Sequence, residues 1–169
     1  MFICQILWQP IKLMICYSEG KTMKFEGNVT INAPQQEVWE FLTDPNNVAQ
    51  CVPGLKSLEV VIPDKQFDVI ASVGLGAVNV TFDASVEWVE LDAPNLAKMK
   101  AHGTAPGSAV DVTSEMKLSS DENGITTLDW SADVVVVGTI ASLASRLMPG
   151  ITKKLSGTFF DCFKKQIEK

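Results

Sequence analysis

Few side chains in this sequence are suited to acid–base or metal chemistry. Its 169 residues include one histidine, His102, which excludes any metal site or catalytic triad that needs two or more histidines. His102 shares its strand parity with Lys98 and Lys100, so all three side chains are expected on the same, outward face. We therefore expect a solvated surface histidine, with no metal, no cofactor and no catalytic residue.

The four cysteines also lack the spacing that metal or redox chemistry needs. Cys4, Cys16, Cys51 and Cys162 form no Cys-X-X-Cys pair, so nothing supports a zinc ribbon or a thioredoxin-type site. Scattered cysteines of this kind are typical of reduced, partly buried thiols in a cytoplasmic protein. We expect that state, with a disulfide framework as the alternative.

The elements that position these residues are mostly strands. Apolar and polar residues alternate from Phe25 to Ile31, which predicts a first strand over 24–32. The period stays at two after Leu55, with glycine, proline and aspartate at the turns. Short turns between consecutive strands indicate an antiparallel meander. The further strands are predicted at 58–62, 66–73, 77–91, 95–103, 108–119 and 125–137.

Helices flank this meander. Pro34 and Asp44-Pro45 predict the starts of two short helices, which end before Pro53-Gly54. Over 139–168 the apolar residues recur at a period near 3.6, which predicts one long helix with a kink at Pro149-Gly150. A sheet with one apolar face needs a cover, and only this helix is large enough. The predicted fold class is α+β: a seven-stranded antiparallel sheet wrapped around a long C-terminal helix, with two short helices after the first strand.

The predicted face of the sheet toward the long helix is almost entirely apolar. Its one hydroxyl is Ser114, and no carboxylate, histidine or lysine falls on it, so acid–base and nucleophilic catalysis lack their groups. Such a face is either a packed core or the wall of a cavity. Small residues such as Ala84 and Ala97, and adaptable methionines, favour a cavity for an apolar molecule. The predicted lining residues are Val52, Pro53, Phe82, Met99, Val112, Ser114, Met116, Trp130, Leu143, Leu147, Met148, Ile151 and Leu155.

Composition and charge limit the classes of binding partner that the sequence favours. Hydrophobic residues make up 46% and charged residues 20%, which is ordinary for a folded domain. The net charge of −6 argues against a nucleic-acid binder, which needs a basic face. The long helix is the exception, and we leave two interpretations of it open: a solvated face, or a docking surface for anionic lipid or an acidic partner. Its basic residues are Arg146, Lys153, Lys154, Lys164, Lys165 and Lys169, against Asp161 and Glu168.

The first residues differ from the rest of the chain. The apolar stretch over 2–16 is interrupted by polar residues and by Pro10, and is too short to span a bilayer. It lacks the basic start and the cleavage site of a signal peptide. We interpret 1–22 as an N-terminal extension, disordered or loosely packed, before a single domain over 23–169. An apolar arm that covers the core or touches lipid is the alternative.

Several short motifs resemble a known family. They are Phe25-Glu26-Gly27, Ala33-Pro34 with Glu37-Val38-Trp39, Phe41–Pro45, Cys51–Gly54, Val73-Gly74, Val80–Phe82, Glu90–Asp92, Gly107–Ala109 and Gly138. In this order they resemble the G-subunit family of carbon monoxide dehydrogenase, which belongs to the START-like, or SRPBCC, helix-grip superfamily. The resemblance covers Met23 to Lys169, and the Asp44-Pro45 and Pro53-Gly54 pair is its most specific part. Val52 stands where the family usually has leucine or isoleucine.

This resemblance implies a helix-grip fold with an apolar cavity. It also implies an accessory role beside molybdenum-containing carbon monoxide dehydrogenases or related hydroxylases, membrane recruitment of the dehydrogenase, and a lipid-like or quinone ligand. Many members carry a hydrophobic C-terminal anchor. The sequence stops at Lys169 without one, which weakens the anchoring role and leaves the basic helix for peripheral contact with the inner face of the membrane.

We therefore expect a non-enzymatic, cytoplasmic carrier of a quinone or lipid-like molecule, accessory to a molybdenum hydroxylase of the carbon monoxide dehydrogenase type. Two alternatives stay open. An enzyme similar to the polyketide cyclases and dehydratases would need Asp, Glu, His102 or Tyr17 to converge in the cavity. An assembly adaptor would bind the dehydrogenase with its outer face and would have a collapsed cavity.

Overall fold

The computed structural model describes residues 21–168, so most of the predicted N-terminal extension lies outside the described residues. The first strand, β1, spans Lys21–Ile31 and thus includes the last two residues of that extension. Lys21 pairs with Val136 and Thr22 with Val135 on the last strand of the sheet. The ordered sheet therefore begins slightly earlier than the hydrophobic alternation indicates.

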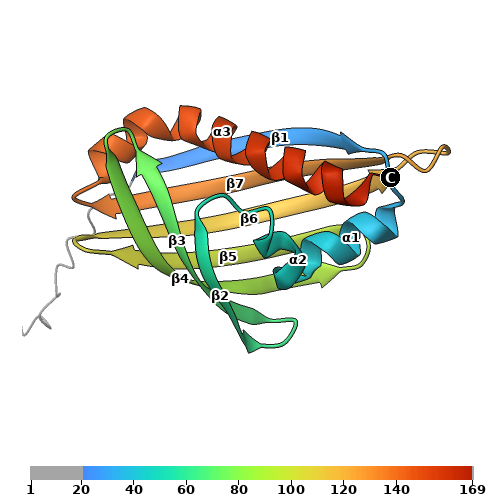
Figure 1. Ribbon diagram of the computed structural model, residues 1–169, viewed down its shortest axis with the longest axis horizontal. Coiled ribbons are helices and arrows are strands. Elements are labelled where there is room, and N and C mark those ends of the chain that lie inside the picture. Colours follow the sequence, from blue (N-terminus) through green and yellow to red (C-terminus); the bar gives the residue numbers. More distant parts are fainter. Residues whose placement is uncertain (1–20, 169) are drawn as a thin grey trace, which may run out of the picture.

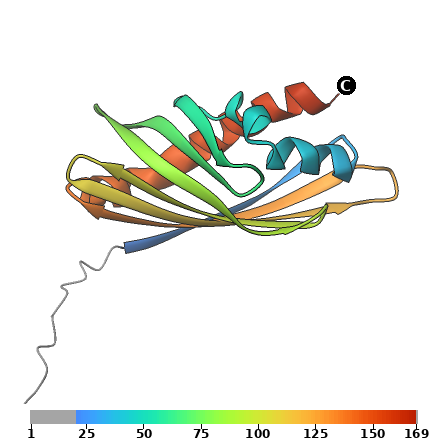
Figure 2. The ribbon, with the colours of Figure 1, turned by 90° about the horizontal axis from the view of Figure 1, so that it is seen from below.

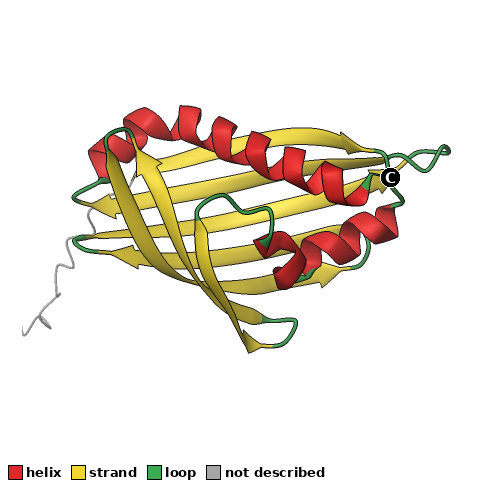
Figure 3. Ribbon diagram, in the orientation of Figure 1, coloured by secondary structure: helices red, strands yellow, loops and turns green. Residues whose placement is uncertain are grey.

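Seven antiparallel strands and three helices make up the described fold (Figures 1 and 3). The strand order is β1-β7-β6-β5-β4-β3-β2. Strands β2 to β7 therefore form a meander, and the last strand, β7, pairs with the first, β1. This confirms the predicted fold class. The remaining bounds are α1 (Gln35–Thr43), α2 (Pro45–Ala49), β2 (Leu55–Ile62), β3 (Gln66–Leu75), β4 (Val78–Asp92), β5 (Leu96–Ala105), β6 (Ser108–Ser120), β7 (Thr126–Gly138) and α3 (Ala141–Ile167).

The helices begin where local chemistry favours them. Pro34 has an extended backbone, with ψ at 143°, and its carbonyl accepts the N–H of Val38 to start α1. The Asp44 side chain accepts the N–H of Asn46 at 2.9 Å and so caps α2. The long helix α3 continues through Pro149, which lacks the N–H that an interior position would donate.

All three helices lie on the same face of the sheet, as the view in Figure 2 shows. Strands β2 and β3 bend out of the plane of the other strands toward the helices (Figure 2). The Gln35 side-chain amide contacts the Pro94 and Leu118 carbonyls, each at 3.1 Å, and so ties α1 to the ends of β4 and β6. The described molecule is thus a curved sheet whose concave side holds all of the helices.

Two apolar clusters fill opposite ends of the space between α3 and the sheet. The larger surrounds Phe163, which is completely buried near the C-terminal end of α3 and packs with α1 and β7. The smaller surrounds Ala144, 1% exposed, near the start of α3, and packs on Val134 and Val136. Each large apolar side chain buried in this way contributes roughly 1.5–3 kcal/mol to stability. The clusters therefore fix both ends of the helix against the sheet.

Candidate functional site

A cavity of about 540 Å³ lies under α3. Its helical wall runs from Thr152 to Phe160, between the two packed clusters, and its far wall is the concave face of the sheet. The cavity is open to solvent on part of its surface. Its lining residues are Leu42, Pro45, Val48, Ala49, Val52, Pro53, Leu55, Leu58, Phe67, Val69, Ala71, Val73, Val86, Trp88, Ala97, Met99, Ser114, Met116, Leu128, Trp130, Thr152, Leu155, Ser156, Phe159 and Phe160.

The described wall of this cavity is almost entirely apolar. It holds no carboxylate, imidazole, amine, guanidinium, phenol or thiol among residues 21–168. Its hydroxyls come from Ser114, Thr152 and Ser156. The Ser114 hydroxyl donates to the Ser131 carbonyl at 2.9 Å, and that of Ser156 donates to the Lys153 carbonyl at 3.3 Å. The wall can exclude water from an apolar molecule and offer serine lone pairs to it.

Aromatic side chains form one side of the cavity. Trp130 on β7 lies near Phe160 on α3, with ring centroids 6.3 Å apart, and Phe160 meets Phe159 edge-on at 5.2 Å. The Trp130 indole packs over Gly27, where an added Cβ would come within 3.0 Å of Nε1. Glycine at this point of β1 therefore makes room for the indole. The rings present a broad apolar surface to whatever occupies the cavity.

The loop between α2 and β2 supplies another part of the wall, through Val52 and Pro53. Gly54 follows with φ at +79°, in the left-handed region that favours glycine, and any Cβ there would collide with the Ser72 carbonyl. Its own carbonyl accepts the Ser72 N–H at 2.8 Å. The Pro-Gly pair thus turns the chain sharply and docks it on β3, which holds Pro53 at the cavity.

The structure places about half of the predicted lining residues on this wall. Met99, Ser114, Met116 and Trp130 reach it from the sheet. Val52, Pro53 and Leu155 reach it from the loop and from α3.

The residues that line this cavity do not include Phe82, Val112, Leu143, Leu147, Met148 and Ile151, whose role as ligand contacts stays a prediction. Val112 and Met148 pack instead against the smaller cluster around Ala144. Leu147 faces the β3–β4 turn, where its Cδ1 lies 3.5 Å from the position of a Cβ on Gly76. Phe82 sits beside Ala71 in the sheet. Leu143 and Ile151 are half-buried on α3. In this part of α3, Ala144 and Met148 pack against Val134 and Val136 of the sheet.

Sequence reasoning missed the contribution of the β2–β3 hairpin and of α1 and α2. The hairpin supplies Leu55, Leu58, Phe67, Val69, Ala71 and Val73. A signal for these residues existed, because those on β3 alternate at a spacing of two and share one face. What the alternation does not show is that the hairpin bends out of the sheet toward the helices, as Figure 2 shows.

Ionisable groups with shifted pKa values lie on the other face of the sheet or at its turns. The hydrogen bond from Lys117 lowers the pKa of Glu115, and the backbone N–H of Ile125 lowers that of Asp121. His102 is exposed there, as predicted, with Nδ1 2.6 Å from Oδ1 of Asp111. Within residues 21–168, no group of three or more His, Cys, Asp or Glu side chains is placed to hold a metal ion. Tyr17 lies outside the described residues.

The expectation of reduced thiols is corrected for two of the four cysteines. Cys51 and Cys162 form a disulfide between the α2–β2 loop and α3, with Cα atoms 5.4 Å apart. The residues are separated by 111 positions in the sequence, and only the fold brings them together. Cys4 and Cys16 lie outside the described residues.

The sheet, the long helix and the cavity define a helix-grip protein. A solved structure with a similar fold is a conserved protein from Geobacillus kaustophilus, with 26% identity and a TM-score of 0.79, covering 86% of this chain and 95% of that chain. The Zhui aromatase/cyclase from Streptomyces sp. R1128 has 18% identity and a TM-score of 0.69, covering 88% and 94%. Norcoclaurine synthase from Thalictrum flavum has 14% identity and a TM-score of 0.61, covering 88% and 95%.

The family follows from the sequence match. The family of the carbon monoxide dehydrogenase G subunit (CoxG) matches residues 27–168, so this chain belongs to the CoxG family. No curated protein matches the chain.

Proposed function

We propose that this chain binds a quinone or a lipid-like molecule in the cavity under α3 and carries it as an accessory to a molybdenum hydroxylase of the carbon monoxide dehydrogenase type. The observation that carries the proposal is the cavity of about 540 Å³ without an ionisable side chain among its described lining residues. Pockets for small molecules have volumes of roughly 300–1,000 Å³ and mostly apolar walls. The partner enzyme is proposed from family membership alone.

Burial of apolar surface would supply the binding free energy. Removing apolar area from water gives roughly 25 cal/mol per Å² before the costs of ordering the ligand. Trp130 and Phe160 offer aromatic surface to a planar ring, and Met99 and Met116 offer side chains that adapt to different shapes. These features support a guest that has a ring or an acyl chain.

Ser114 is proposed to orient the polar end of the guest. Because its hydroxyl proton is donated to the Ser131 carbonyl, the lone pairs of Oγ are left to accept a hydrogen bond. The other proposed ligand contacts from the sequence prediction are Val52, Pro53, Met99, Met116, Trp130 and Leu155. The proposed entrance lies between the Cys51–Gly54 loop, the sheet hairpins and α3.

A carrier is favoured over an enzyme similar to the cyclases. General acid–base catalysis needs a positioned titratable group, and covalent catalysis needs a nucleophile beside a base. The described cavity wall provides neither, and His102 points away from it. The adaptor alternative expects a collapsed cavity, and the volume under α3 argues against it.

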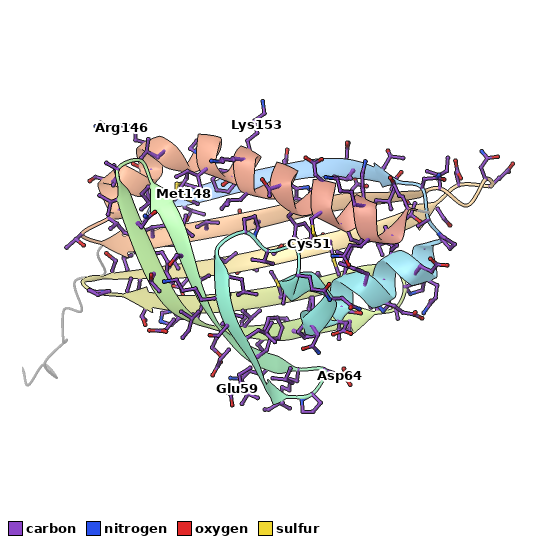
Figure 4. All side chains as sticks on the ribbon, viewed as in Figure 1. Cys51, Glu59, Asp64, Arg146, Met148 and Lys153 are labelled. Atoms are coloured by element: carbon purple, nitrogen blue, oxygen red, sulfur yellow. A yellow bond between two sulfur atoms is a disulfide. The ribbon has the colours of Figure 1, made fainter. Side chains whose placement is uncertain are left out.

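We further propose peripheral contact between α3 and the cytoplasmic face of a membrane. Figure 4 shows Arg146 and Lys153 at the outer margin of α3, where both are exposed. The ion pairs of the described residues involve Lys98, Lys100, Lys117 and His102, so the cations of α3 stay available for an outside partner. Each such cation near an anionic surface contributes about 1 kcal/mol. No helix within residues 21–168 is long and apolar enough to cross a membrane.

The carrier proposal is tested by what the protein retains. The purified protein is incubated with a lipid and quinone extract, separated from free ligand, and analysed by mass spectrometry. We expect one class of apolar molecule to remain with the wild type and to be lost from Met116→Trp, because the larger ring fills the cavity. Thr113→Trp is the matched control, since Thr113 is exposed and shares the outward face of the same strand with Asp111 and Lys117. A wild type that stays empty, or a Met116→Trp variant that retains the same molecule, would contradict the proposal.

Membrane contact has a separate test. Arg146→Glu combined with Lys153→Glu should abolish co-sedimentation with vesicles that contain phosphatidylglycerol, and high salt should do the same to the wild type. Lys98→Glu with Lys100→Glu reverses the same number of charges on the far face of the sheet and should leave sedimentation unchanged. Equal binding to neutral phosphatidylcholine vesicles would show that charge is not the cause.

A further inference from the structure

The Cys51–Cys162 disulfide joins two parts of the cavity wall. Cys51 directly precedes Val52 and Pro53, which line the cavity from the loop. Cys162 follows Phe159 and Phe160, which line it from α3. Figure 4 shows Cys51 beneath α3, where the loop meets the helix. A bond at this place fixes the distance between loop and helix, and therefore the width of the cavity beside it.

Little else of a polar kind ties this loop to α3. Among the described residues, the loop is held by the hydrogen bond between Gly54 and Ser72 on the sheet side. On the helix side, Gln166 Nε2 approaches the Cys51 sulfur itself at 3.5 Å. The Cys162 sulfur also lies 3.8 Å from the Gln50 carbonyl, and Cys51 packs in the larger core cluster together with Phe163 and Ile167. Breaking the bond would thus leave mainly apolar packing to hold the loop against the helix.

The two cysteine residues differ in exposure. Cys51 is 4% exposed, whereas Cys162 is partly exposed on α3. A thiolate reagent therefore reaches the sulfur of Cys162 first. It forms a mixed disulfide there, the Cys51–Cys162 bond breaks, and Cys51 leaves and takes up a proton. The second thiol of a dithiol reagent then displaces Cys162, so the reagent is oxidised to its own disulfide and the protein gains two thiols.

We propose that this pair is a redox-operated latch on the cavity: the disulfide retains the bound molecule, and reduction by a dithiol releases it. The latch rests on the proposed function, because it needs a ligand in the cavity. Disulfides in reducing compartments are usually transient and serve catalysis or sensing. Such a latch suits a carrier, which must keep its ligand bound during transfer and then release it.

The experiment measures release rates in the two redox states. The full chain carries Cys4→Ser and Cys16→Ser, so that Cys51 and Cys162 are its remaining cysteines. The protein is oxidised with diamide, loaded with the apolar fluorophore N-phenyl-1-naphthylamine, and chased with excess lipid in a stopped-flow instrument, with and without prior reduction by dithiothreitol. We expect reduction to speed dissociation about tenfold, since changes at a binding site act mainly on the dissociation rate.

A second variant separates the latch from damage to the fold. Cys162→Ser breaks the bond at its more exposed end and should dissociate quickly whether or not dithiothreitol is present. Equal dissociation rates for the oxidised and reduced proteins, with binding intact, would overturn the latch and leave the carrier proposal standing. Alkylation of both Cys51 and Cys162 after diamide treatment would also overturn it, because no bond would have formed. A protein that binds no probe in either state would overturn the carrier and the latch together.

Discussion

The two halves of α3 meet the same sheet in different ways. The first half packs on β1 and β7 through Ala144, whose small side chain lets the helix approach closely, and Met148 completes the contact. The second half carries Leu155, Phe159 and Phe160 over open volume. The difference shows that one helix with a continuous apolar stripe can pack a core at each end and line a cavity between them.

The largest effect on stability is expected from removing a phenylalanine ring, compared between the packed core and the cavity wall. Phe163→Ala should lower the free energy of unfolding by about 3–5 kcal/mol, because Phe163 is fully buried between Phe41 and Phe159. Phe160→Ala, one turn earlier and facing the cavity, should cost only about 1–2 kcal/mol, since fewer packed atoms lose their neighbours. Urea unfolding of both ligand-free variants measures the difference. Equal losses would mean that the cavity end is packed like the core.

Enlarging a small side chain tests the same difference between the packed end of α3 and the cavity wall. Ala144→Leu should destabilise the protein by about 1–3 kcal/mol, since a closely packed site has no room for the added atoms. Ala71→Leu adds the same atoms to the cavity wall and should change stability by less than about 1 kcal/mol, while it weakens binding of an apolar probe. Thermal unfolding and a probe titration record the two results. Strong destabilisation by Ala71→Leu would contradict an open cavity.

A smaller effect is expected at the one sheet hydroxyl of the cavity. Ser114→Ala should weaken binding of a long-chain alcohol by roughly tenfold at most, the worth of one hydrogen bond, and should leave an alkane of equal length unaffected. The comparison of the two ligands is its own control, because both bury the same apolar chain. Equal loss for alcohol and alkane would assign Ser114 to packing.

The smallest effect concerns pH. The described cavity wall has no ionisable group, so ligand affinity should stay constant as long as the protein is folded. Stability should respond at the Asp121 turn, where the backbone N–H of Ile125 lowers the pKa of the carboxyl. A lowered pKa stabilises the fold above the ordinary aspartate value and loses that contribution as the pH falls through the folded value. The stabilities of the wild type and Asp121→Asn should therefore converge as the pH falls. Their ligand affinities should be equal at neutral pH. A wild-type affinity that changes with pH would reveal an ionisable group at the site.

The sequence predicted which face of a strand or helix each side chain lies on. It did not predict where along α3 the helix packs tightly on the sheet and where it leaves a cavity. Strand parity predicted correctly that Met99, Ser114, Met116 and Trp130 look toward the helices, because successive side chains in a strand must alternate. Helical periodicity likewise predicted which side of α3 is apolar. It could not show that Leu147 and Met148 lie at the packed end, since that depends on how closely Ala144 lets the helix approach.

The disulfide and the bent hairpin illustrate a second limit. Cys51 and Cys162 are far apart in the sequence, and only the docking of α3 on the loop brings them together. The contribution of Phe67 and Val69 to the cavity depends on the bend of β2 and β3 over the sheet. Both features are long-range geometry, which local patterns do not contain.

The most direct measurement is a crystal structure of the protein loaded with a long-chain quinone. The proposal predicts electron density for the ring in the cavity, against the Trp130 and Phe160 side chains, with the polar end within hydrogen-bond distance of Ser114 Oγ. A structure in which the protein's own side chains fill the space under the second half of α3, or in which the quinone binds elsewhere, would contradict it.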